Sequence, residues 1–502
     1  MDPMIRCLVR RDTYRDSVEL MRVAAALEQR PGVARAALLM GTPANRGLLS
    51  QAGLLVGDAE AARPNDLVVV IQAVDEASTQ TALGEAERLL ADHATAPSGS
   101  AGEALPHTIS DALVTAPTAN LAIISTPGAY AAAEALKALK RGLHVFLFSD
   151  NVPIDEEIEL KRLARKKGLL VMGPDCGTAI LDGVPVGFAN AVRRGHIGLV
   201  GASGTGLQQV SCLIDREGEG VSQVIGVGGH DLDERVGGLM MLAGIERLAG
   251  DEGTSVIVLV SKPPSDEVAR HVLEVARASG KPVVVNFLGG HVESIRQAGA
   301  VVVAATLEEA ARFAVALARK APLPALAGVD AKLVERARAR IGRFSTEQRC
   351  VRGLYSGGTL CQEAAMILEQ SSGRSAGHSL IDLGDDEFTV GRPHPMIDFR
   401  LRNERIAAAA EDPTTAVVLF DVVLGYGAHP DPARALVPVI MHARERAKRL
   451  GRALGFIASV CGTASDPQDL AGQEEALEKN GVTLAPSNAQ AARLAALLVR
   501  EG

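Results

Sequence analysis

The apolar residues of this chain fall into short continuous runs, separated by amphipathic stretches with a helical period. Apolar runs of this length that alternate with helices are typical of parallel β-strands buried on both faces. From about residue 116 the alternation continues nearly to the end of the chain and predicts an α/β protein with doubly wound parallel sheets. The expected strands cover residues 121–125, 144–148, 169–172, 197–200, 223–227, 255–260, 282–285, 379–383, 415–420 and 454–460.

The first 95 residues follow a different order, and their pattern fits a small ferredoxin-like or ACT-like module. We interpret this module mainly as a docking or oligomerisation domain, with an effector site as the alternative. Its strands are expected at 5–9, 33–39 and 66–73, its helices at 17–29 and 76–92, and a loop between the second and third strands. The low-complexity residues 94–103 that follow predict a linker.

These patterns divide the chain into six segments, and the last two α/β domains resemble distant copies of each other. Each of the two domains has a Gly-rich turn that opens a helix near its start. The segments are the module at 1–95, the linker at 96–115, a small Rossmann-like domain at 116–190, a doubly wound domain at 191–322, a bridge at 323–350 and a second doubly wound domain at 351–502.

The two Gly-rich turns are the main candidates for binding chemistry. A helix start leaves backbone N–H groups free and carries the positive end of the helix dipole, so it attracts anions. The expected phosphate contacts are Ser203, Gly204, Thr205 and Gly206 in the first turn and Ser356, Gly357, Gly358 and Thr359 in the second. An ordinary capped helix is the alternative at each turn. The sequence leaves open whether the turns form one shared site or two.

Composition and charge exclude several classes of function. The net charge is −8 and no dense Lys/Arg run is present, so neither nucleic acid nor a membrane is expected as a partner. The first 11 residues lack the apolar region of a signal peptide, and the longest apolar runs are too short to span a bilayer. The six cysteines contain no CxxC pair, which argues against a disulfide scaffold or a zinc ribbon and favours the cytoplasm. No metal site is expected, because the acidic set Asp382, Asp385, Asp386 and Glu387 lacks EF-hand spacing.

Several segments resemble the ligase core of succinyl-CoA synthetases. Residues 172–177 resemble the G-P-N-C turn of that family, residues 203–205 the start of its phosphate-binding helix, and residues 226–231 its G-I-G-G-D loop. The stretch 356–427 resembles the ligase domain of the β subunit. The resemblance implies two flavodoxin-like ligase domains preceded by a reduced CoA-binding lobe at 116–190. It also implies substrate contacts at Asp175, Cys176, Gly228 and Gly229, although Cys176 without an activating partner is interpreted as a buried thiol.

The chain departs from this family at the positions that carry its chemistry. Gln297 stands where the family has its phosphohistidine, and His291 could replace that histidine only in a rearranged loop. Lys262 stands where the family has a supporting glutamate. The bridge at 323–350 leaves no room for an ATP-grasp domain, and the first βα unit of the CoA lobe is absent, which puts CoA binding in doubt.

The features that survive predict a phosphate cradle with a catalytic lysine, Lys262. Backbone N–H groups and a lysine can hold a phosphoryl group, and they fit transfer to or from an acyl or carbamoyl phosphate without a covalent enzyme intermediate. Arg392 and His394 are candidates for the carboxylate of the substrate, because arginine offers a bidentate fork. A rigid structural loop or a contact with a partner subunit is the alternative for these two residues.

Residues 147–152, 173–180, 391–398 and 485–489 resemble the FdrA family, and the similarity extends over essentially the whole chain. That family is commonly labelled acyl-CoA synthetase by homology. It is also associated with allantoin and purine breakdown, as one subunit of an oxamate carbamoyltransferase that converts oxalurate and phosphate to oxamate and carbamoyl phosphate. The second activity accommodates the loss of the histidine, and it is our leading hypothesis.

The leading hypothesis implies phosphate or carbamoyl phosphate as substrate, no further cofactor, and other subunits of the same enzyme as partners, together with homo-oligomerisation. Two alternatives stay open. One is an acyl-CoA synthetase subunit that borrows the nucleotide site of another polypeptide. The other is a non-catalytic scaffold that assembles partner enzymes through its N-terminal module.

Overall fold

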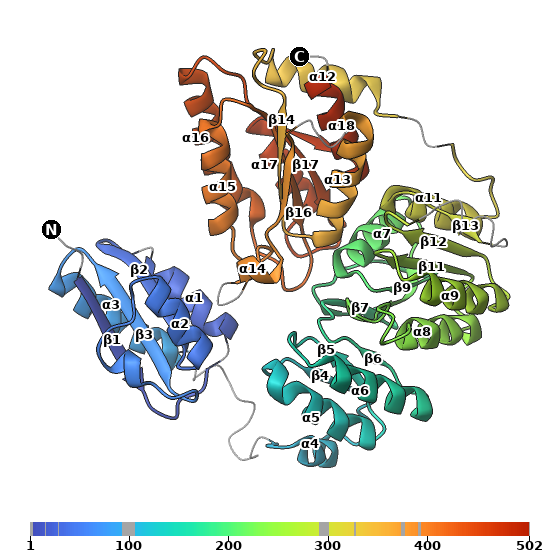
Figure 1. Ribbon diagram of the computed structural model, residues 1–502, viewed down its shortest axis with the longest axis horizontal. Helices are drawn as coiled ribbons and strands as arrows, with labels where there is room; N and C mark the ends of the chain where they lie inside the picture. Colours follow the sequence, from blue (N-terminus) through green and yellow to red (C-terminus); the bar gives the residue numbers. More distant parts are fainter. Residues whose placement is uncertain are drawn as a thin grey trace. The chain divides into compact units, whose positions relative to one another are not determined.

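The computed structural model divides the chain into two compact units, Met1–Pro106 with Thr389–Pro393 and His107–Phe388 with His394–Gly502 (Figure 1). Antiparallel strands build the first unit, and parallel strands dominate the second. The structure describes residues 4–15, 17–28, 30–92, 106–290, 301–325, 328–372, 377–389 and 393–500.

The first unit is an antiparallel sheet with the strand order β1-β3-β2, covered on both faces. Its elements are β1 (Met4–Arg10), α1 (Ser17–Glu28), β2 (Val33–Met40), α2 (Pro43–Gln51), the 3-10 helix η1 (Gly57–Ala61), β3 (Leu67–Ala73) and α3 (Glu76–Asp92). Alternate residues of β3 point to opposite faces, so Val69 and Ile71 pack under α1 and α3 while Val68 and Val70 pack under α2 and η1. The loop expected between the second and third strands therefore contains two short helices that cover the second face.

The second unit begins with a three-stranded parallel sheet in the order β4-β5-β6. Its elements are α4 (Ile109–Thr115), β4 (Leu121–Ile124), α5 (Gly128–Lys140), β5 (His144–Leu147), α6 (Ile154–Lys167) and β6 (Val171–Met172). Helix α5 buries an alanine-rich face that includes Ala131, Ala135 and Ala138. Small side chains let the helix lie close to the strands, so a short sheet is packed tightly.

A seven-stranded sheet follows, in the order β13-β12-β11-β9-β10-β7-β8. Strands β9 to β13 are parallel, while the hairpin of β7 and β8 joins the sheet antiparallel to β10. The pattern of apolar runs did not predict this hairpin. The strands are β7 (Thr178–Leu181), β8 (Val184–Gly187), β9 (Arg194–Gly201), β10 (Val221–Gly226), β11 (Val256–Ser261), β12 (Val283–Phe287) and β13 (Val302–Val303).

Helices cover both faces of this sheet, which makes it doubly wound (Figure 1). Leu199 of β9 faces one side and Val200 faces the other, because successive strand residues point to opposite faces. Helices α7 and α11 contribute to the first core, and α8 and α9 to the second. These helices are α7 (Gly204–Arg216), α8 (Leu239–Gly250), α9 (Asp266–Ala278) and α11 (Leu307–Ala318).

The last sheet has five parallel strands in the order β15-β14-β16-β17-β18. Its strands are β14 (Cys350–Tyr355), β15 (Ser379–Asp382), β16 (Thr415–Val423), β17 (Gly455–Cys461) and β18 (Val482–Ala485). Helices α13 and α18 pack together on one face, and α15 and α16 pack together on the other (Figure 1). The helices are α12 (Ala331–Ile341), α13 (Gly358–Ser372), α14 (Asp386–Thr389), α15 (Arg400–Glu411), α16 (Pro432–Arg449), α17 (Leu470–Lys479) and α18 (Asn488–Arg500).

The seven-stranded and five-stranded sheets share one continuous hydrophobic core, which includes Val210 of α7 together with Ala364 of α13. Buried polar contacts also join them. The Asn190 side-chain amide donates to the carbonyl of Leu424 and to Asp466, at 2.9 Å and 2.8 Å. The two sheets therefore hold the starts of α7 and α13 in a defined relation.

Candidate anion-binding site

The first Gly-rich turn connects β9 to α7 and is capped by its own sequence. Ser203 has an extended backbone, and its hydroxyl accepts a hydrogen bond from the N–H of Gly206 at 3.0 Å. A Cβ atom on Gly206 would collide with that hydroxyl, so a glycine is required there for the cap to form. This local arrangement satisfies one of the N–H groups that a helix start leaves free.

The second turn lies directly against the first. The hydroxyl groups of Ser203 and Thr359 are hydrogen-bonded at 2.6 Å. A Cβ atom on Gly357 would lie 2.9 Å from the Cβ atom of Thr205, a separation that would force the turns apart. The structure thus brings together the two turns that the sequence identified separately, and the starts of α7 and α13 meet at one place.

Part of the second turn is already occupied by a carboxylate of the protein. Asp421, in β16, accepts hydrogen bonds from the backbone N–H groups of Ser356 and Gly357, both at 2.8 Å, and from the Ser356 hydroxyl. Arg402 pairs with Asp421 at 2.7 Å, and both side chains are fully buried. Ser356 and Gly357, expected to bind phosphate, use these donors inside the protein.

Four N–H groups remain where the two helices start. Within the described part of the chain, the backbone N–H groups of Gly204, Thr205, Gly358 and Thr359 have no hydrogen-bond acceptor. Gly204, Thr205 and Gly358 are partly exposed, so a solute can reach them. Donors from two helix starts, each with the positive end of a dipole, make this place suitable for an anion.

Asp382, at the end of β15, is a site residue that the search for phosphate contacts missed. One of its carboxyl oxygens accepts from the N–H of Gly384 at 2.9 Å, and the other lies so close to Gly358 that a Cβ atom there would collide with it. Burial raises the pKa of Asp382 to about 6; the Gly384 N–H and the charge of Lys262 oppose this rise, and Asp421 adds to it. The carboxyl group therefore titrates near neutral pH.

Lys262 follows β11 directly and is exposed. Its charge acts on Asp382 and on Cys361 of α13, where it opposes the rise that burial causes in the pKa of each group. The next residue, Pro263, lies near Gly289, which is itself close to Met366 of α13. The charge of the lysine thus acts on two groups near the second helix start.

His394 lies beside Gly384, where a Cβ atom would be 2.9 Å from its Nε2 atom. Its Nδ1 atom accepts from the N–H of Met396 at 3.2 Å, so the neutral ring carries its proton on Nε2. Burial lowers the pKa of His394 to about 4, which keeps the ring neutral at pH 7. The ring centroid lies 5.7 Å from that of Phe188. Arg392, its expected companion, lies outside the described residues, as do His291 and Gln297.

The remaining expected substrate contacts are part of a tight loop contact. Gly228 has a φ of +86°, and a Cβ atom there would collide with the carbonyl of Pro174. Cys176 is 3% exposed, and burial raises its pKa to about 12, so it is the buried thiol that the sequence suggested. Asp175 is exposed, and one of its carboxyl oxygens would lie 3.9 Å from a Cβ atom on Gly229. Among these four residues, Asp175 thus has an exposed polar side chain that a solute could contact.

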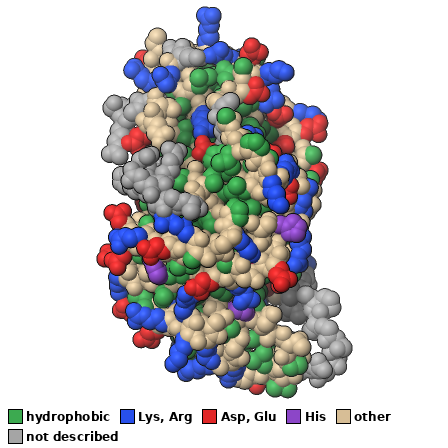
Figure 2. All heavy atoms as spheres, turned by 90° about the vertical axis from the view of Figure 1, so that its right-hand side faces the viewer, with side chains coloured by type: hydrophobic (Ala, Val, Ile, Leu, Met, Phe, Trp, Pro, Cys, Tyr) green, Lys and Arg blue, Asp and Glu red, His purple; other side chains and the backbone are tan. Residues whose placement is uncertain are grey.

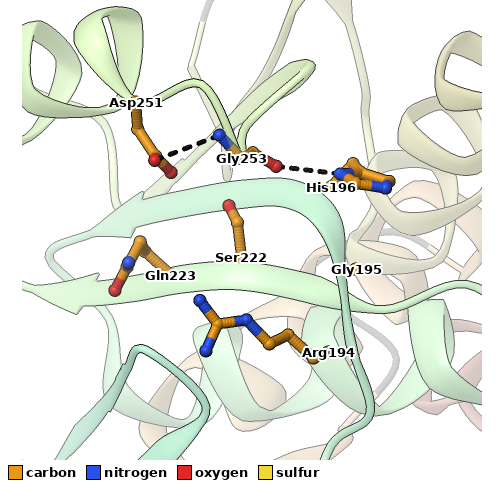
Figure 3. Close-up of a pocket in the computed structure, with 7 residues that line it drawn as sticks. All are labelled: Arg194, Gly195, His196, Ser222, Gln223, Asp251 and Gly253. Carbon is orange, nitrogen blue, oxygen red and sulfur yellow. Dashed lines mark hydrogen bonds between the residues drawn. The ribbon is translucent and has the colours of Figure 1, made fainter.

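A shallow cavity of about 250 Å³ lies away from the helix starts. Arg194, His196, Ser222, Gln223 and Asp251 line it with Gly195 and Gly253 (Figure 3). These residues lie at or before the amino ends of β9, β10 and β11, whereas α7 begins after the carboxyl end of β9. Ligands in open α/β sheets bind at the carboxyl ends of the strands, so we do not place the site in this cavity.

The described residues contain no group of three His, Cys, Asp or Glu side chains that could hold a metal ion. Nor is any helix among them long and apolar enough to cross a membrane. On the face drawn in Figure 2, the basic and acidic side chains of the described residues are interspersed.

Comparison with known proteins shows to which family the chain belongs. YahF of Escherichia coli strain K12, an uncharacterized protein, is 42% identical over an alignment of 516 positions that covers 99% of each chain. The chain belongs to the YahF (FdrA-like) family. This YahF-family protein is also 28% identical over 180 residues to the α-2 subunit of a mitochondrial succinate–CoA ligase from Trichomonas vaginalis, over 34% of this chain and 57% of that one.

Sequence profiles of three domain families match this YahF-family chain. The CoA-ligase profile matches residues 354–498, and the CoA-binding profile matches residues 192–289. The second match falls on the seven-stranded domain, whereas the sequence resemblance put the reduced CoA lobe at 116–190. The profile described as "AllF, heavy metal-associated domain" matches residues 4–106, a stretch whose only cysteine is Cys7. The protein thus combines an AllF-like N-terminal domain with a succinyl-CoA synthetase-like core.

Proposed function

We propose that this YahF-family protein is a subunit of a carbamoyltransferase of the oxamate type, which converts oxalurate and phosphate to oxamate and carbamoyl phosphate. The observation that carries the proposal is the pair of helix starts joined by the Ser203–Thr359 hydrogen bond, with four N–H groups still free to bind an anion. The AllF-like N-terminal domain supports a place in allantoin breakdown.

The residues around the helix starts suit a reaction that needs positioning and charge stabilisation only. The four N–H groups, the two helix dipoles and Lys262 would stabilise phosphate as it attacks or leaves. The Nε2–H group of neutral His394 would donate a hydrogen bond to an oxygen of the carbamoyl acceptor. Gln297 in place of the phosphohistidine is consistent with direct transfer, because glutamine cannot carry a phosphoryl group.

Calorimetric titration with carbamoyl phosphate tests this function. We expect the wild-type protein to bind carbamoyl phosphate and the affinity to fall about fivefold in the Lys262→Ala variant. The expected fall is small because solvent screens a charged hydrogen bond from an exposed lysine. Lys332→Ala, on the exposed start of α12, is the matched control and should leave the affinity unchanged. If carbamoyl phosphate does not bind, or if both variants behave alike, the lysine has no part in such a site.

A second candidate is an acyl-CoA synthetase subunit that uses the nucleotide site of another polypeptide. The CoA-ligase and CoA-binding profiles favour it. Under this alternative, CoA binds to the purified chain and carbamoyl phosphate does not. Oxamate turnover that appears only when candidate partner subunits are added would instead favour the carbamoyltransferase and its assembly with other subunits.

A further inference from the structure

An acidic side chain at an anion site raises a physical problem. One oxygen of the Asp382 carboxyl group lies against Gly358, one of the residues whose N–H group is free for an anion. An ionised carboxylate there would repel a bound phosphate, whereas a protonated carboxyl group would donate a hydrogen bond to it.

We propose that Asp382 takes up a proton when an anion binds between the two helix starts, and that during transfer it gives this proton to the departing nitrogen and takes another from phosphate. The inference rests on the proposed function, because it assigns a role to a residue of the same site.

The geometry leaves one oxygen of Asp382 available for this role. The Gly384 N–H group holds Oδ1 at 2.9 Å, and Oδ2 has no hydrogen-bond donor among the described residues. Residue 358 must be glycine for Oδ2 to come this close to the start of α13, since a Cβ atom would occupy its place. The carboxyl group is thus fixed on one side and open on the side where the anion would lie.

The groups around Asp382 also favour this residue, rather than Asp421, as the one that takes up a proton. Asp421 on β16 and Asp385 on the same loop are the acidic groups, Lys262 after β11 is the basic group, and Cys361 and His394 are the other titratable neighbours. Asp421 is saturated by Arg402 and by three donors of the second turn. Asp382, with its pKa raised to about 6 by burial, can change its charge near neutral pH.

The reaction moves one proton from phosphate to nitrogen, and such a carrier can transfer it. When an oxygen of hydrogen phosphate attacks the ureido carbon of oxalurate, a C–O bond forms, the C–N bond to the oxamate nitrogen breaks, and that nitrogen needs a proton. The proton lost by hydrogen phosphate is the one gained by the nitrogen. Asp382, protonated when phosphate is bound, would donate its proton to the nitrogen and take the proton lost by phosphate in its place, and it would end in its starting state.

Calorimetric titration with sulfate tests the proton uptake, because sulfate stays fully ionised where phosphate itself would titrate. The wild-type protein is titrated at about pH 7.5 in two buffers that differ in their enthalpy of ionisation, and again at about pH 6.5. We expect uptake of about one proton per sulfate and an affinity about tenfold weaker at the higher pH. Sulfate binding without proton uptake by the wild-type protein overturns the inference, even if no variant folds.

The variant Asp382→Asn should bind sulfate with no proton uptake and with the same affinity at both pH values. Glu387→Gln removes an exposed carboxylate from α14 and should keep the wild-type behaviour. Proton uptake that persists in Asp382→Asn overturns the inference and leaves the proposed function standing. If sulfate and phosphate fail to bind at either pH, the anion site and the proposed function fail as well.

Discussion

The two Gly-rich turns have nearly the same local sequence pattern and different uses for their N–H groups. The first turn is capped within itself, by the Ser203 hydroxyl on Gly206. The second receives a carboxylate from a neighbouring strand, since Asp421 takes the N–H groups of Ser356 and Gly357. A Gly-rich helix start therefore offers several backbone N–H donors, and the surrounding side chains decide which of them remain for a ligand.

The largest effect is expected from Arg402→Ala, which leaves the Asp421 carboxylate buried without its cation. Removal of one partner of a buried ion pair typically costs about 3–5 kcal/mol of unfolding free energy. Urea denaturation measures it. The exposed pair of Arg446 and Glu411 provides the control, and Arg446→Ala should leave stability unchanged. Equal midpoints for the two variants would contradict the structural role of Asp421.

The next effect is expected from Gly357→Ala, because the added methyl group would meet Thr205 at 2.9 Å and separate the two turns. We expect a loss of about 1–3 kcal/mol in stability and a loss of anion binding, measured by denaturation and by titration with sulfate. Gly250→Ala, at the end of α8 with open space around it, is the control. If anion binding survives in Gly357→Ala, the turns do not share a site.

The Ser203→Ala variant tests how much the contact between the two turns adds to stability. It removes a helix cap, worth about 1 kcal/mol, and the hydrogen bond to Thr359. Ser265 caps α9 through Val268 and has no second hydrogen-bond partner among the described residues, so Ser265→Ala removes a cap alone. Thermal or urea unfolding should show a larger loss for Ser203→Ala. The same loss in both variants would mean that the contact between the turns adds nothing.

The smallest effect concerns pH. The pKa of Asp382 is raised in the folded protein to about 6, from an ordinary value of 3.8, so the folded state binds more protons than the unfolded state between these values. Stability should therefore fall as the pH rises from about 4 to 6, by about 1 kcal/mol relative to Asp382→Asn. Urea unfolding of both proteins across this range measures the difference. A rise in that difference with pH would contradict the burial of the carboxyl group.

Much of the fold follows from the chain itself. Apolar runs such as 255–260 and 415–420 mark buried parallel strands, because every residue of such a strand faces a helix layer. The hairpin of β7 and β8 was missed because its residues are short runs with partly exposed positions, which carry little periodic signal. Strands β13, β14 and β18 were missed as well, because β13 has only two residues and because Arg352 and Gly353 in β14 and Thr483 in β18 interrupt the apolar runs.

The sequence by itself determined the alternation of strands and helices and the Gly-rich helix starts. Those features depend on local backbone preferences and on residue identity. The tertiary structure alone decided that Asp421 fills part of the second turn, that Asp382 lies against Gly358, and that Ser203 meets Thr359. These contacts join residues far apart in the chain, and only the order of the strands and the packing of two sheets into one core brings them together.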